Sequence, residues 1–153
     1  KYSNYFSNKT PISLHFRIGD YVKNLAMHPV LPIEYYIKSI SFLKDKINNI
    51  ERNNYILVFG EFKDKEKIEN HIQRINHVFP NLEILICDYN IEDWEQMLLM
   101  SLCQHNIIAN SSFSWWGAYF NNNEKIVCYP SIWNGSTNDT KDLFSENWNK
   151  III

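Results

Sequence analysis

Glycine is scarce in this sequence of 153 residues, which contains four in all. Neither of the glycine-rich loops that cradle phosphates, GxGxxG and GxxxxGK[ST], occurs in it. An Asp-x-Asp pair is also missing, and the five histidines are dispersed along the chain, so closely spaced ligands for a divalent cation are lacking. These absences exclude a dinucleotide fingerprint and a P-loop, and they predict a site that needs no metal and no other cofactor.

Strong charge of one sign and long apolar runs are absent as well. The net charge is -2 and no basic stripe occurs, so a nucleic-acid partner is not expected. No run approaches the roughly 20 apolar residues that cross a bilayer, and the first four residues do not resemble a signal peptide. Cys87, Cys103 and Cys128 lie in apolar stretches without CxxC spacing, which indicates buried thiols of a reducing compartment. We therefore expect a protein of the cytoplasm or of the cytoplasmic face of a membrane.

What the sequence does contain is a regular alternation of strand-like and helix-like segments, and we interpret residues 1–153 as a single domain. Strands are predicted at 12–17, 55–60, 83–87, 107–109 and 125–129. Helices are predicted from Pro32, around Ile68–Ile75, after a cap at or near Asn90, from Ser112, and in a short stretch between Thr140 and Trp148. Near-continuous apolar strands separated by helices are typical of a parallel sheet, so we expect a Rossmann-like three-layer α/β domain.

Two polar clusters each follow a strand directly. Residues 15–20 read His-Phe-Arg-Ile-Gly-Asp, and residues 110–118 read Asn-Ser-Ser-Phe-Ser-Trp-Trp-Gly-Ala. In an open α/β sheet, ligands bind outside the carboxyl ends of the strands. The two clusters are therefore predicted to form one site for a nucleotide diphosphate.

The first cluster offers an imidazole and a guanidinium on the same side of a strand, because His15 and Arg17 are two residues apart. The planar fork of Arg17 suits a diphosphate, since it binds two oxygens at once and keeps its charge. The alternative is that Arg17 only forms an ion pair with Asp20 that holds a turn.

The second cluster combines small hydroxyls with two tryptophans. Backbone N–H groups at a helix start bind anions, and Ser111 and Ser112 would add hydroxyl donors there, although either could simply be the N-cap. Trp115 and Trp116 cannot easily share one face of a helix. At least one of them is therefore a candidate for lining a sugar or base pocket, and packing in the core is the alternative.

Several segments together resemble the α-1,2-fucosyltransferases of glycosyltransferase family 11. Residues 15–21 resemble the motif H-x-R-R-G-D-Y of that family, residues 31–36 resemble L-P-x-x-Y-Y, and residues 97–119 form the longest and most specific match; residues 125–133 and 143–148 resemble the segments near its C-terminus. The match spans nearly all of the chain but only the second half of a family member. The resemblance implies the donor-binding half of a two-domain GT-B glycosyltransferase.

The resemblance also implies roles for individual residues. Arg17 would bind the β-phosphate of GDP-fucose and act in catalysis together with Asp20, which would order Arg17 and its loop. The residues implied in donor binding are His15, Arg17, Gln96, Asn110, Ser111, Ser112, Phe113 and Ser114, with Trp115 and Trp116 at the sugar. The expected reaction is inverting transfer of L-fucose from GDP-β-L-fucose to a glycan acceptor, such as a terminal galactose, in an α-1,2 linkage. The expected partner is an N-terminal domain of the same protein, without which residues 1–153 should not transfer fucose.

Three positions depart from the pattern of the family. Ile18 replaces the second arginine of the motif, Gly60-Glu61 stands where Ser-Asp is frequent, and Gln96 stands where an acid is frequent. A second interpretation therefore stays open, a nucleotide-sugar-binding or interaction module that has lost catalysis. Ile18 favours that interpretation, whereas Arg17 and the intact segment 110–118 favour an enzyme.

Overall fold

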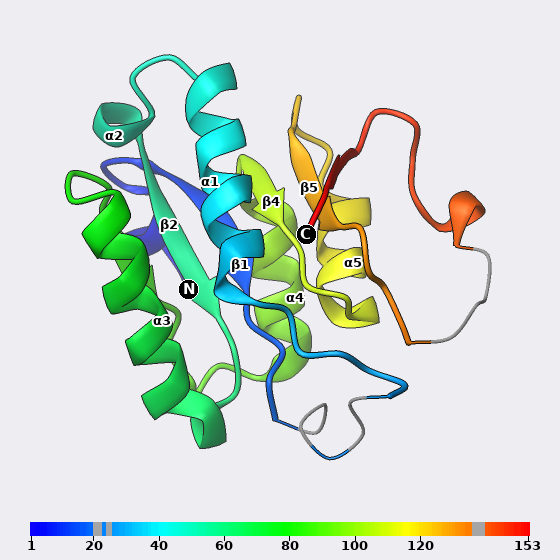
Figure 1. Cartoon of the computed structure of the whole chain (residues 1–153). Helices are drawn as coiled ribbons and strands as arrows, with labels where there is room; N and C mark the ends of the chain where they lie inside the picture. The colour runs from blue at the N-terminus through cyan, green and yellow to red at the C-terminus, as the bar shows by residue number, and fades with distance from the viewer. Residues whose placement is uncertain (20–22, 24–25, 136–139) are drawn as a thin grey trace.

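The computed structural model describes residues 1–19, 23, 26–135 and 140–153, and its architecture is a parallel sheet between two layers of helices (Figure 1). The strands are β1 (Thr10–His15), β2 (Asn54–Phe59), β3 (Ile84–Ile86), β4 (His105–Ile107), β5 (Val127–Pro130) and β6 (Asn149–Ile151). The five predicted strands are confirmed, with ends that differ by a few residues. The sixth was missed because Asn149-Lys150-Ile151 is short and largely polar, and it forms only as an edge strand paired with β5.

The helices cover both faces of the sheet. They are α1 (Ile33–Lys46), α2 (Ile50–Asn53), α3 (Lys65–Val78), α4 (Asp93–Leu102) and α5 (Ser112–Phe120), with 3-10 turns η1 (Ser3–Phe6), η3 (Phe62–Asp64) and η4 (Lys141–Leu143). Alternate residues of β1 and β2, such as Ile12 and Ile56, pack against α1 and α3. Residues of the opposite parity, such as Leu57 and Phe59, pack against α4. This alternation follows from the period of two in a strand, and it produces the predicted three-layer domain.

Large apolar side chains lie on both the exposed and the buried side of α4. Trp94, Leu98 and Leu102 are 61%, 43% and 60% exposed, whereas Leu99 and Met100 are buried. The N-cap, predicted at or near Asn90, is Glu92, and the helix begins at Asp93.

The close approach of α5 explains the orientation of α4. A Cβ atom on Gly117 would lie 2.7 Å from the Cβ of Met100, so the two helices touch where α5 has no side chain. The segment Met97–Leu102 is apolar on nearly every side. Its sequence therefore did not indicate which side meets α5.

The order of the strands places the carboxyl ends of β1 and β4 side by side. The order is β3-β2-β1-β4-β5-β6, so the chain builds the sheet outward from β1 in one direction and then outward from β4 in the other. At such a switch point the crossover helices lie on opposite faces and leave a crevice for a ligand. Both predicted polar clusters meet at this crevice, where the rings of His15 and Phe113 are 5.4 Å apart.

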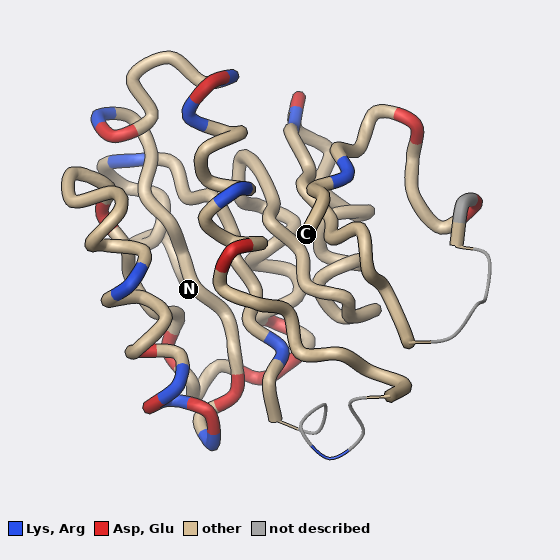
Figure 2. Tube along the Cα trace, viewed as in Figure 1, with Lys and Arg blue, Asp and Glu red and all other residues tan. Residues whose placement is uncertain are grey.

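The remaining features concern cysteines, charge and membrane spans. Cys87, Cys103 and Cys128 are buried and not joined in disulfides. Acidic and basic residues are scattered over the described part of the chain, as Figure 2 shows. Among the described helices, none is long and apolar enough to cross a membrane.

Candidate functional site

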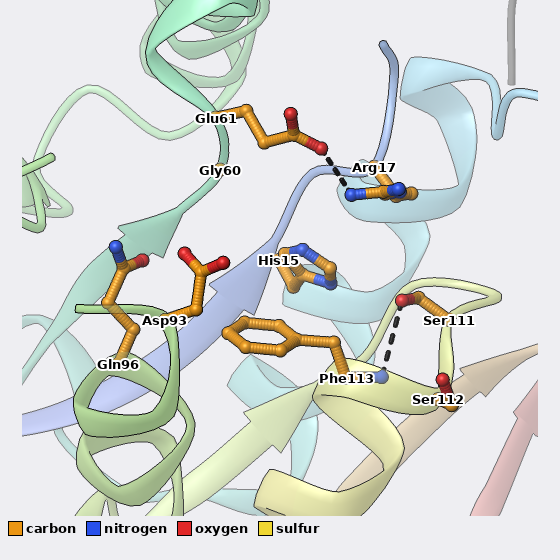
Figure 3. A pocket seen from close by; sticks show the side chains of 9 residues that line it. All are labelled: His15, Arg17, Gly60, Glu61, Asp93, Gln96, Ser111, Ser112 and Phe113. Carbon is orange, nitrogen blue, oxygen red and sulfur yellow. Dashed lines mark hydrogen bonds and ion pairs between the residues drawn. The ribbon is translucent and has the colours of Figure 1, made fainter. Parts of the chain in front are cut away.

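A pocket of about 250 Å³ lies at the carboxyl edge of the sheet (Figure 3). It is lined by His15, Arg17, Gly60, Glu61, Asp93, Gln96, Ser111, Ser112 and Phe113. These residues follow β1 and β2 and occupy the starts of α4 and α5. The pocket thus brings together six of the residues expected to bind the donor.

Arg17 lines this pocket and forms an ion pair with Glu61. Glu61 also forms an ion pair with Lys63, in which Nζ lies 2.6 Å from Oε2. The Arg17 and Glu61 side chains are 27% and 36% exposed, so water screens the pair and an incoming anion can compete for the guanidinium. Asp20, the expected partner of Arg17, lies outside the described residues.

Glu61 and Asp93 were not among the predicted site residues. A signal for Glu61 was available, because it follows the carboxyl end of β2, the strand that pairs with β1. Asp93 stands one helical turn before Gln96, and this spacing places both side chains on the same side of α4. Both carboxylates are hydrogen-bond acceptors only. The pocket therefore contains acidic groups, which a purely basic phosphate site would lack.

His15 is buried at the end of β1 and remains neutral. Its side chain is 4% exposed, and its Nδ1 atom has no hydrogen-bond partner among the described residues. Burial, together with the nearby Arg17 charge, lowers the pKa of His15 to about 3. A neutral imidazole in this place can hydrogen-bond a ligand without adding charge to it.

The depressed pKa of His15 predicts how stability changes with pH. The unfolded chain, in which histidine has a pKa of about 6.5, binds a proton between pH about 6.5 and about 3, and the folded chain does not. The free energy of unfolding should therefore fall as the pH is lowered through this range. His15→Gln should give a shallower slope in urea unfolding at pH 7, 6 and 5. Burial also lowers the pKa of His71 and of His105, so the free energy of unfolding of the variant should still depend on pH to some extent. If His15→Gln leaves the slope unchanged, the lowered pKa of His15 is contradicted.

The start of α5 supplies the second anion-binding element of the pocket. Ser111 is the N-cap, and its hydroxyl accepts a hydrogen bond from the Phe113 N–H at 3.3 Å. The helix begins at Ser112, as predicted, and runs for nine residues. The first turn of such a helix directs N–H groups and the positive end of the helix dipole toward the crevice. N-capping by Ser111 and anion binding are thus compatible in this structure.

Two residues of the predicted donor set instead hold the turn between β4 and α5. Ser114 is 1% exposed, and its hydroxyl accepts from the Ala109 N–H at 3.1 Å. Asn110 is 3% exposed, and its Nδ2 donates to the Pro29 carbonyl at 2.9 Å. Neither lines the pocket, so both act here by shaping the loop that carries Ser111 and Ser112.

Gln96 and Asp93 form the wall opposite Arg17. In Figure 3 these two side chains lie on one side of His15 and Phe113, and Arg17 with the two serines lies on the other. The Nε2 of Gln96 donates to the Ile91 carbonyl at 2.8 Å, which fixes the amide. The pocket therefore has a cationic end, an aromatic middle and an end rich in hydrogen-bond acceptors. Such an arrangement can bind an anionic group at one end and hydrogen-bond donors of a ligand at the other.

A second cavity of about 430 Å³ adjoins the first at Ser112, and we name it the tryptophan cavity. It is lined by His28, Asn110, Ser112, Trp115, Trp116, Trp133, Asn134 and Leu143. The rings of Trp115 and Trp116 are nearly perpendicular, with their centroids 4.9 Å apart and their planes at 89°. Both tryptophans expected at a sugar thus line this cavity and not the first pocket.

Comparison with known proteins identifies relatives of the chain. Residues 4–152 match the family model described as glycosyl transferase family 11. The chain is 40% identical to the O-antigen biosynthesis glycosyltransferase WbnK of Escherichia coli, over 92% of this chain and 44% of that protein. It is 39% identical to an alpha-1,2-colitosyltransferase of Escherichia coli, over 80% of this chain and 40% of that protein. The chain therefore spans less than half the length of these curated relatives.

Solved structures with the same fold are also glycosyltransferases. The ADP-heptose LPS heptosyltransferase II of Escherichia coli superposes with a TM-score of 0.59 at 17% identity, covering 97% of this chain and 41% of that one. A family 9 glycosyl transferase of Veillonella parvula gives a TM-score of 0.54 at 12% identity, covering 95% of this chain and 35% of that one. The predicted Rossmann-like α/β fold is thereby confirmed.

Proposed function

Because the chain belongs to glycosyl transferase family 11, we propose that it binds the donor in an inverting transfer of L-fucose from GDP-β-L-fucose to a sugar hydroxyl, giving an α-1,2 linkage. The observation that carries this proposal is the position of Arg17 across the crevice from the start of α5, at the switch point of the sheet. The proposed acceptor is a glycan that ends in galactose. Most contacts to this acceptor are proposed to come from a further domain of the protein.

The diphosphate is proposed to lie between Arg17 and the first turn of α5. As the acceptor hydroxyl attacks the anomeric carbon from the opposite side and loses its proton to a general base, the C–O bond to the β-phosphate breaks and negative charge grows on the departing oxygen. The guanidinium and the helix start stabilise that charge more in the transition state than in the ground state. These groups supply the positive charge that a metal ion would otherwise bring, so we propose transfer without a divalent metal.

The guanine is proposed to lie toward Asp93 and Gln96. Guanine presents two adjacent N–H donors on its Watson–Crick edge, and a carboxylate and an amide oxygen are acceptors that suit them. His15 and Phe113 lie between this end and the phosphate end, where they would contact the nucleoside. Asp93 would thus provide the negative charge that Gln96 does not carry.

Transfer of colitose is a second candidate for the same site. The chain is 39% identical to an alpha-1,2-colitosyltransferase, which is close to its identity with the other curated relative. The identity of the donor sugar therefore has to be decided by experiment.

Transfer assays with the full-length protein test the proposal. GDP-fucose and the GDP-linked colitosyl donor are each offered with a galactose-terminated acceptor, with UDP-galactose as the control donor. We expect an α-linked product at the 2-hydroxyl from GDP-fucose, unchanged by excess chelator, and no product from UDP-galactose. A product from the colitosyl donor alone would favour the second candidate. Loss of activity on chelation that manganese or magnesium restores would contradict metal independence.

A further inference from the structure

We propose that the tryptophan cavity is a binding site for a neutral sugar ring, and that Trp133 forms one wall of it. Trp133 comes from the segment after β5, far in the sequence from the tryptophans of α5, and it was not among the predicted site residues. The inference rests on the proposed glycosyl transfer and adds to it a second subsite beside the one for the nucleotide.

The chemistry of the lining favours an uncharged ligand. Among the described residues that line the tryptophan cavity, none carries a carboxylate, an ammonium or a guanidinium group. The adjoining nucleotide pocket, in contrast, is lined by Arg17, Glu61 and Asp93. A phosphate would therefore be bound in the first pocket and not in the second, whereas a sugar carries no charge to be compensated.

The combination of indole rings with amides also suits a sugar. One face of a pyranose ring presents C–H groups and can lie against an aromatic ring, while its hydroxyls need donors and acceptors at the edge. Ligand pockets combine apolar walls with a few placed polar groups in this manner. Asn110, Asn134 and His28 carry such donors and acceptors in the lining.

The aromatic walls are held in place before any ligand arrives. The Nε1 of Trp115 donates to the Leu143 carbonyl at 2.9 Å, and its ring stacks on Tyr119 at 5.0 Å and 11°. Trp133 packs edge-on against Phe144 at 5.1 Å and 76°. Walls that are already fixed lose little conformational entropy when a ligand binds.

The position of the cavity fits a group-transfer reaction. Ser112, the first residue of α5, lines both the nucleotide pocket and the tryptophan cavity. A sugar in the cavity would lie next to a diphosphate bound at the start of α5. Such proximity of the two reacting parts is what transfer requires.

Two sugars have the required chemistry, the fucosyl group of the donor and the terminal sugar of the acceptor. The kinetics of Trp133→Ala in the full-length protein separate them. If the acceptor occupies the cavity, we expect KM for the acceptor to rise about tenfold or more, with KM for GDP-fucose within twofold of wild type. If the fucosyl group occupies it, we expect binding of GDP-fucose to weaken about tenfold while binding of GDP, measured by calorimetry, stays within twofold.

Three further variants serve as a control, a conservative replacement and a second test. Trp94→Ala removes an indole that is 61% exposed and outside both cavities, and it should leave all these constants within twofold. Trp133→Phe keeps an aromatic face and should recover most of the loss. Trp116 is 43% exposed, so Trp116→Ala provides a second test if Trp133→Ala does not fold.

The inference is overturned if Trp133→Ala, or Trp116→Ala in its place, folds and keeps all acceptor and donor constants within twofold of wild type. That result differs from failure of the proposed function, which would appear as GDP binding that is absent or insensitive to Arg17→Ala. The two proposals can therefore fail separately.

Discussion

Replacing Arg17 by alanine in the full-length protein is expected to lower kcat/KM for the donor by about a hundredfold or more, the scale of a lost electrophilic contact. The guanidinium lines the pocket across from the start of α5, where the departing diphosphate is proposed to gain charge. Loss of this group should affect kcat as well as donor affinity, because its interaction is stronger in the transition state. Initial rates at varied GDP-fucose concentration measure both.

Two further variants separate the phosphate contact from simple charge. Arg17→Lys should not restore activity, because an ammonium cannot reproduce the bidentate fork of a guanidinium. Lys63→Ala removes the other cation that pairs with Glu61 and serves as the matched control, with an expected loss well below that of Arg17→Ala. Near-normal turnover of the lysine variant would show that Arg17 does not bind the phosphate by its fork.

Replacing Asn106 by alanine is expected to reduce the free energy of unfolding by about 3 kcal/mol or more, because several buried polar groups lose their partners at once. Asn106 is 1% exposed on β4, and its Nδ2 donates to Ser13 Oγ at 2.7 Å and to the Met100 carbonyl at 2.9 Å. Its Oδ1 accepts from Asn121 Nδ2 at 2.8 Å. This side chain therefore joins β1, β4, α4 and the end of α5.

Urea denaturation of the variants tests this network. Asn122→Ala, at an exposed position after α5, is the matched control and should change the free energy of unfolding by less than about 0.5 kcal/mol. A double-mutant cycle of Asn106 and Asn121 should give a coupling energy of about 1 kcal/mol, since the two amides contact each other directly. If Asn106→Ala is as stable as the control, the buried network contributes little to holding these elements together.

The sequence by itself determined the class of the fold and predicted the edge of the sheet at which the candidate site lies. The alternation of apolar strands with amphipathic helices permits few arrangements other than a parallel sheet covered on both faces. In such a sheet the carboxyl ends of all strands share one edge, so His15, Arg17 and the serines at the start of α5 had to lie along it. Their types then indicated anion binding, because a guanidinium and a helix start both attract negative charge.

Only the tertiary structure decided which side chains meet within that edge. Glu61 follows a predicted strand, but it reaches the pocket only because β2 pairs with β1. Asp93 reaches it because α4 packs on α5, a long-range contact that leaves no local pattern in the sequence. The separation of Trp115 and Trp116 from the nucleotide pocket, and their meeting with Trp133, likewise depend on how the segment after β5 returns to α5. Local periodicity fixes which face of an element is apolar, but it does not fix which distant element covers that face. Leu98 and Leu99 of α4 show this limit. Both are apolar, but only Leu99 is buried, because α4 packs closely against α5 at Gly117.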